Sequence, residues 1–167
     1  MLLRPARPED TEALVELSQS TGVFKPHELE VLRDLLDEFH GGLAGEDHFV
    51  TVAEIEGSPV GYTYFAPDVM TDGTWYLYWI AVLRGEQGRG IGAGLVRQME
   101  EEVNRREGRL ILIETTSLPH SEATRTFYLR MGYALEGVIR DFYSDGDDMV
   151  IFRKRLRGKD RLPGREP

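Results

Sequence analysis

The chain has 167 residues, with 20 Lys and Arg against 29 Asp and Glu, which gives a formal net charge of −9 when the histidines are neutral. A hydrophobic fraction of 41% and a charged fraction of 29% are ordinary for one folded domain of this length, so the composition excludes a chain that is disordered throughout. The acidic balance disfavours nucleic acid as a partner, and the absence of cysteine excludes disulfides, thiolate nucleophiles and cysteine-ligated zinc.

Predicted elements alternate between strands and helices from the first residues onward. Leu2 to Pro5 predicts a short first strand, and Asp10 is placed to cap the helix that follows. A second helix is expected to begin at Pro26 and to end at Gly41. The first ten residues contain two Arg-Pro pairs instead of the apolar core of a secretory signal, and no apolar run reaches the roughly 18 to 20 residues that span a bilayer. We therefore expect a cytoplasmic protein with no membrane partner.

The middle of the chain reads as strands. Phe49 to Ile55 and Val60 to Phe65 predict a hairpin, because both runs are apolar and a Gly-Ser-Pro turn separates them. Thr74 to Leu83 predicts a long strand rich in aromatic and β-branched residues.

A glycine-rich loop opens the second half of the chain. A helix with a four-residue apolar stripe is expected from Ile91 to Arg106, followed by a buried strand from Leu110 to Thr115. Ser121 to Met131 predicts a further helix, and Tyr133 to Asp141 with Met149 to Leu156 predicts a closing hairpin.

This order predicts a single α/β (α+β) domain over residues 1–157 and a basic tail over residues 158–167. Residues 153–167 carry seven basic and two acidic side chains, which leaves a net charge of −14 on residues 1–152.

Glycines alternate along residues 87–93, Gln-Gly-Arg-Gly-Ile-Gly-Ala, between the long strand and the helix. Such a turn leaves the first helical amides free, which suits an anionic group such as a pyrophosphate, and Arg89 could add a charge contact. The P-loop pattern fails because Ala93 and Gly94 stand where it needs Lys and Ser or Thr. The dinucleotide pattern does not fit either. A plain tight turn stays as the structural alternative.

The motif Gln87-x-x-Gly90-x-Gly92, placed after Ile80-Ala81-Val82, resembles the acyl-coenzyme A signature of the GNAT acetyltransferase superfamily. Ser121 to Tyr133 resembles the last helix of that family, which ends in Tyr-x-x-x-Gly-aromatic. The similarity covers residues 2 to 156. It implies a mixed, mostly antiparallel central sheet of about seven strands flanked by about four helices and splayed at the acyl-CoA site. The chain departs from the family pattern at Arg84, Ser121 and Thr124, where Pro, Asn and Ala are usual.

By this resemblance the cofactor is acetyl-CoA. The strand backbone would bind the pantetheine arm and polarise the thioester, and the loop amides would hold the pyrophosphate. The implied cofactor-binding residues are Ile80, Ala81, Val82, Gln87, Gly88, Arg89, Gly90, Ile91, Gly92, Ala93, Ser121, Thr124 and Phe127.

Tyr128 matches the family tyrosine and is predicted to be the general acid, because a phenol is protonated at neutral pH and can donate to a departing thiolate. The alternative is a core tyrosine bonded to a backbone carbonyl. Glu114 is the candidate base by resemblance to the branch that acetylates protein N-termini. Its alternative is a strand-end carboxylate that bonds a loop, with a water chain lined by Tyr76 and Tyr78 acting instead.

Aromatic or imidazole side chains form a pool for the acceptor pocket, most of which is expected in the core: Phe24, His27, Tyr62, Tyr64, Trp75, Tyr76, Tyr78 and Trp79. The candidates chosen from it are Phe24, His27, Tyr76 and Tyr78. Strict alternation along the aromatic strand would place Trp75 and Trp79 on the face opposite Tyr76 and Tyr78. Specificity is expected to lie in the loops Thr21 to Pro26 and Ser144 to Asp148.

No metal site is expected. The histidines are scattered, and the aspartates near the last turn lack calcium-loop spacing, which favours a solvated turn. We expect an acetyl-CoA-dependent N-acetyltransferase for a primary amine of a small molecule or amino acid. The alternatives are acetylation of a protein N-terminus or lysine and a non-catalytic CoA-binding sensor. The resemblance also allows a homodimer.

Overall fold

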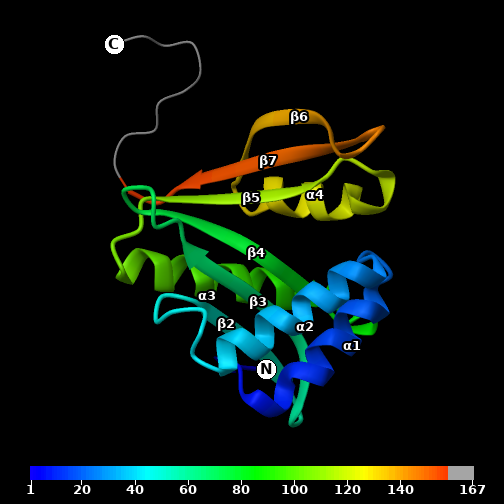
Figure 1. The fold of residues 1–167 in the computed structure, drawn as a ribbon, viewed down its shortest axis with the longest axis vertical. Coiled ribbons are helices and arrows are strands. Elements are labelled where there is room, and N and C mark those ends of the chain that lie inside the picture. Colours follow the sequence, from blue (N-terminus) through cyan, green and yellow to red (C-terminus); the bar gives the residue numbers. More distant parts are fainter. Residues whose placement is uncertain (158–167) are drawn as a thin grey trace.

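A computed structural model describes residues 1–157 (Figure 1). The predicted basic tail, 158–167, lies outside the described residues. The order of helices and strands is the one predicted from the sequence, with element ends shifted by a few residues at most. The elements are β1 (Leu2–Pro5), α1 (Thr11–Thr21), α2 (Pro26–His40), β2 (Phe49–Ile55), β3 (Ser58–Pro67), β4 (Thr74–Val82), α3 (Ile91–Arg105), β5 (Leu110–Thr116), α4 (Glu122–Arg130), β6 (Ala134–Ser144) and β7 (Asp147–Arg155).

The strands form one seven-stranded sheet in the order β1-β2-β3-β4-β5-β7-β6. Every neighbouring pair is antiparallel except β4 and β5, which are parallel. Four α-helices flank this sheet within the described residues, so the predicted fold class is confirmed. The helices of residues 1–157 are too short or too polar to serve as membrane spans.

Two layers of helices cover the sheet and create two main core clusters (Figure 1). On one face, the apolar stripe of α3 and Tyr128 of α4 pack with residues of β4, β5 and β7. On the other face, leucines of α1 and α2 pack against β2 and β3. The predicted stripe of α3, whose members are Ile91, Leu95, Met99 and Val103, is buried. Burial of these aliphatic and aromatic side chains is the main favourable contribution to the stability of the fold.

The sheet splits between β4 and β5. These strands pair only from Thr74 with Leu110 to Leu77 with Ile113. Beyond Leu77, β4 continues to Val82 in pairing with β3, while β5 continues to Thr116 in pairing with β7. The edge of β4 that faces β5 therefore has no strand partner from Tyr78 onward, as the splayed sheet implied by the resemblance requires.

A β-bulge in β4 corrects the prediction of strict alternation. Tyr64 of β3 pairs with Trp79, but its neighbour Phe65 pairs with Leu77, so Tyr78 is an extra residue. As a result, Trp75 packs into the cluster under α3 and Trp79 packs into the opposite cluster under α1 and α2. The two tryptophans do not share a face.

One predicted helix cap also needs correction. Asp10 precedes α1, but its carboxylate accepts from the Arg7 amide and the Arg4 guanidinium, and caps no amide of α1. Ser121 precedes α4, and its hydroxyl also makes no cap hydrogen bond. Both side chains are buried.

Candidate functional site

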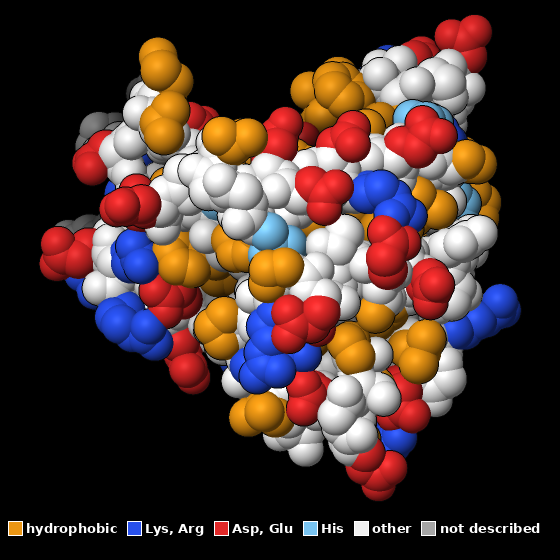
Figure 2. All heavy atoms as spheres, turned by 60° about the horizontal axis from the view of Figure 1, so that its bottom comes forward, with side chains coloured by type: hydrophobic (Ala, Val, Ile, Leu, Met, Phe, Trp, Pro, Cys, Tyr) orange, Lys and Arg blue, Asp and Glu red, His pale blue; other side chains and the backbone are white. Residues whose placement is uncertain are grey.

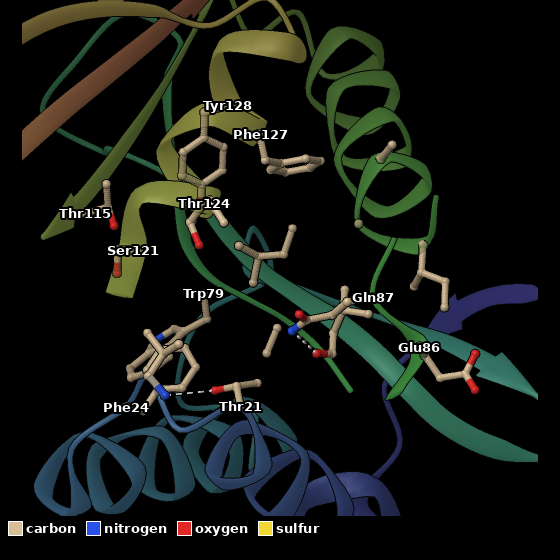
Figure 3. Close-up of a pocket in the computed structure, with 18 of the residues that line it drawn as sticks. Thr21, Phe24, Trp79, Glu86, Gln87, Thr115, Ser121, Thr124, Phe127 and Tyr128 are labelled. Carbon is tan, nitrogen blue, oxygen red and sulfur yellow. Dashed lines mark hydrogen bonds between the residues drawn. The ribbon is translucent and has the colours of Figure 1, made fainter. Parts of the chain in front are cut away.

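A cavity of about 480 Å³ opens where β4 and β5 separate. Its walls come from four parts of the chain: the end of β4, the loop into α3, the end of β5 with α4, and the α1–α2 connection (Figure 3). Most residues predicted for the cofactor lie here together. They are Ile80, Ala81, Val82, Gln87, Gly88, Gly90, Ile91, Gly92, Ala93, Ser121, Thr124 and Phe127.

The glycine loop forms one end of the cavity. Gly88 and Gly90 have φ angles of 77° and 82°, in the left-handed region that favours glycine. Gly90 precedes α3 without a side-chain cap, so the first amides of α3 are free to meet a ligand at the positive end of the helix dipole. The Gln87 side chain donates to the Val82 carbonyl at 3.1 Å and ties the loop to β4.

Three hydroxyl groups of the α4 region line the opposite wall: Ser121, Thr124 and Tyr128. Figure 3 shows them on the side of α4 that faces the cavity. Ser121 and Tyr128 are only 1% and 3% exposed, and neither hydroxyl makes a hydrogen bond within residues 1–157. Neither oxygen is among the fully enclosed atoms that lack a partner within residues 1–157, so both hydroxyls open onto the cavity, where a ligand can reach them.

The Tyr128 ring is held by aromatic neighbours. It packs against Phe127, Tyr133 and Phe152, with ring centroids 5.6 to 6.2 Å apart. Burial raises the pKa of the phenol well above its ordinary value. Tyr128 is therefore neutral at physiological pH, and its hydroxyl carries a proton that it can donate.

Glu114 lies at the end of β5 and lines the same cavity. Partial burial raises the pKa of its carboxyl above the ordinary value. It forms no hydrogen bond or ion pair within the described residues. Its carboxylate is thus free to accept a proton from a group in the cavity.

Three predicted site residues do not line the cavity. The Arg89 guanidinium pairs with Glu86 and is largely exposed. His27 is exposed near the start of α2. Tyr76 is half-buried, and its ring stacks on that of Tyr78 with centroids 5.6 Å apart. Their roles in ligand binding stay predictions. Tyr78 and Phe24 do line the cavity, and Phe24 packs on Trp79 at 5.1 Å.

Several lining residues were absent from the predicted set: Thr21, Val23, Glu86, Thr115 and Ala123. Thr21 and Val23 belong to the loop expected to set specificity, so a weak signal for them existed. Trp79, a member of the wider aromatic pool, lines the cavity beyond the bulge at Tyr78. Glu86 and Thr115 adjoin predicted residues in the chain.

This splayed sheet, with a glycine loop at one end of its cavity and a tyrosine helix beside it, defines an acyltransferase fold. Residues 11–133 match the Acetyltransferase (GNAT) family, and the chain belongs to that family.

Similar proteins agree with this assignment. An uncharacterized N-acetyltransferase of Methanocaldococcus jannaschii is 31% identical over 105 residues, which are 62% of this chain and 64% of that protein. A solved GNAT-family structure from Desulfovibrio desulfuricans has a TM-score of 0.88 and 34% identity, covering 92% of this chain and 98% of its own. An aminoglycoside 6'-N-acetyltransferase complexed with coenzyme A shares the fold, with a TM-score of 0.77 and 18% identity, and covers 96% of this chain and 100% of its own.

Proposed function

We propose that this protein transfers an acetyl group from acetyl-CoA to a primary amine by direct attack, with Tyr128 as general acid and Glu114 as general base. The observation that carries the proposal is the pair of Ser121 and Tyr128 hydroxyls, which have no hydrogen-bond partner within residues 1–157 and line one cavity with the open edge of β4. Hydroxyls that open onto a cavity without a protein partner can bond a ligand there.

The residues of the cavity fit acyl-CoA. Unpaired backbone groups of β4 beyond Leu77 can bond an amide-containing arm as a further strand would. The free amides at the start of α3 can hold a pyrophosphate, and Gly88 and Gly90 present no side chain to it. When bound, acetyl-CoA supplies an activated acetyl thioester.

The side chains then divide the proton transfers. Glu114 accepts a proton from the acceptor ammonium, directly or through water, which frees the nitrogen lone pair for attack. As the C–N bond forms and the C–S bond breaks, Tyr128 donates its hydroxyl proton to the departing sulfur. The nitrogen then loses its second proton to water as the amide forms, and water returns a proton to Tyr128. Glu114 releases its proton to solvent, so the net release is one proton per acetyl group transferred.

Calorimetry with acetyl-CoA and a thiol-release assay over a panel of amines and peptides test the proposal. We expect acetyl-CoA to bind and at least one amine to release thiol. Absence of acetyl-CoA binding would overturn the whole proposal. Binding without thiol release over the panel would favour a CoA-binding sensor, and release with peptides alone would favour acetylation of protein N-termini or lysines.

A further inference from the structure

The charged groups in the cavity are of one sign. Among the described residues that line it, the only ones with a full charge at neutral pH are Glu86 and Glu114. Glu86 pairs with Arg89 at the glycine-loop end, whereas Glu114 has no ionic partner within residues 1–157. Arg125 of α4 donates to the carbonyls of Thr116 and Leu118 and does not line the cavity. The acceptor end of the cavity therefore offers one unpaired negative charge and no lining cation.

A tyrosine ring lines the cavity that holds this negative charge. Tyr78 lines the cavity with Glu114, stacks with Tyr76 at 5.6 Å, and lies 5.9 Å from Tyr64. Burial raises the pKa of Tyr78, and the charges of Asp68 and Glu114 raise it further, so the ring is a neutral phenol at physiological pH.

Carboxylates and aromatic faces together attract organic cations. The negative faces of aromatic rings bind ammonium groups, and a carboxylate adds direct attraction. A carboxylate on the ligand would instead meet Glu114 without any compensating cation on the cavity wall. The hydroxyls of Ser121 and Tyr128 open onto the same cavity without a protein partner within residues 1–157, so they can accept hydrogen bonds from an ammonium or donate them to a ligand.

We propose that the acceptor is a cationic amine without a carboxylate beside it, such as a diamine or polyamine, and that Glu114 and Tyr78, which line the cavity together, recognise its positive charge. This inference rests on the proposed acetyltransferase function. It separates two acceptor classes that the sequence left together, small-molecule amines and amino acids.

Cadaverine and lysine make a matched pair of probes, since they differ only by the α-carboxylate. We expect kcat/KM for cadaverine to exceed that for lysine by at least about 10-fold, because the carboxylate of lysine is repelled by Glu114. Calorimetry with the protein saturated in coenzyme A should show the same order in binding affinity, without turnover. Equal or better use of lysine would overturn the proposal.

Variants of Glu114 test whether this carboxylate is the group that discriminates between cadaverine and lysine. E114Q should shrink the ratio of cadaverine to lysine affinity toward one. E101Q makes the same charge change on an exposed residue of α3 and should leave the ratio as it is. An undiminished ratio in E114Q would refute the role of Glu114 in recognition.

Variants of Tyr78 test the aromatic wall. Y78F keeps the ring face and should bind cadaverine almost as well as the native protein, whereas Y78L should weaken binding several-fold. Equal affinities in Y78F and Y78L would contradict recognition by the ring.

Different binding results would overturn the proposed acceptor class and the proposed acetyltransferase function. Binding of acetyl-CoA with no binding of cadaverine overturns only the acceptor class. Absence of acetyl-CoA binding overturns the acetyltransferase proposal itself.

Discussion

At the scale of single residues, Tyr128 combines two properties that a core tyrosine seldom shows together. Its ring is packed among three aromatic side chains, but its hydroxyl is left without a protein partner. The sequence left a catalytic acid and a backbone-bonded core tyrosine as alternatives. No hydrogen bond of the second kind exists within residues 1–157, so the structure favours the first.

Replacing Tyr128 by Phe removes the donor while keeping the ring. We expect turnover to fall by roughly 10² to 10⁴, the usual contribution of a general acid, with little change in acetyl-CoA affinity. Steady-state kinetics and calorimetry measure the two effects. Y133F is the control, because it removes the hydroxyl of a neighbouring ring that does not line the cavity. Normal turnover in Y128F would exclude Tyr128 as the acid.

Glu114 predicts a pH dependence. Because burial raises the pKa of this carboxyl, the base is lost by protonation at a higher pH than an ordinary glutamate would be. Activity supported by Glu114 is present above its pKa and declines as the pH falls through it. We expect the pH–rate profile of kcat/KM to show this acidic limb in the native protein and to lack it in E114Q. An identical limb in both proteins would assign it to another group.

At the scale of elements, apolar patterns together with turn and capping residues predicted every helix and strand, although β6 is exposed along almost its whole length. The position of Tyr78 shows the limit of that reasoning. A bulge requires no particular residue type, so the sequence does not reveal it. Strict alternation therefore predicted Trp75 and Trp79 on one face, whereas the structure places them in opposite core clusters. The same bulge precedes the unpaired edge of β4 and directs Trp79 toward the cavity.

The glycine loop allows a closely matched substitution test. Gly90 and Gly57 both have a φ of 82°, and neither would bring a Cβ atom within 4 Å of another group. G90E and G57E therefore impose similar backbone strain, but only G90E places a negative side chain where the pyrophosphate is expected. We expect G90E to abolish measurable acetyl-CoA binding in calorimetry and G57E to retain it. Similar affinities in the two variants would refute the assignment of the loop.

Breaking the buried ion pair before α1 should lower the stability of the protein. The Asp10 carboxylate accepts two bonds from Arg4, at 2.7 and 2.9 Å, and one from the Arg7 amide. Both side chains of the pair are at least nine-tenths buried. D10N removes the charge from this carboxylate while Arg4 keeps its second pair with Glu54 at 2.7 Å, so we expect the free energy of unfolding to fall by about 2 kcal/mol at neutral pH. E12Q breaks the exposed pair with Arg33 and should cost about 1 kcal/mol or less.

The effect of Asp10 should also depend on pH in a fixed direction. Burial tends to raise the pKa of Asp10, but the bonds from Arg4 and Arg7 outweigh it and hold the pKa below its ordinary value. The stabilisation is therefore complete above the ordinary pKa of aspartate and is lost as the pH falls through the lowered value. Urea unfolding of the native protein and D10N should converge in this acidic range, and a constant difference would contradict the ion-pair account.

At the scale of the whole molecule, two short motifs predicted the fold and most of the residues that line the cavity, because the glycine loop and the last helix meet there. The acceptor side was less predictable. Its wall joins Phe24, Tyr78 and Glu114 from three elements distant in sequence, and only the tertiary fold brings them together. Local patterns identify such residues as aromatic or charged but do not state which share a cavity.

The net charge of the molecule should act on both proposed substrates. Residues 1–152 carry a net charge of −14, and Figure 2 shows Asp and Glu side chains spread over the α1–α2 side of the molecule, with fewer Lys and Arg. At a distance this surface repels a polyanion such as acetyl-CoA and attracts a cationic amine. The amides at the start of α3 act only at short range.

Salt should therefore act on the two substrates in opposite directions. The screening length falls from about 30 Å at 0.01 M to about 10 Å at 0.1 M ionic strength. Over this range we expect the association rate of acetyl-CoA to rise, since repulsion by the surface is screened, and the KM for cadaverine to rise, since attraction is screened. Stopped-flow binding and steady-state kinetics measure the two. A fall in the acetyl-CoA association rate would instead place a long-range positive patch at the cavity entrance, and Arg89 would then be the residue to substitute.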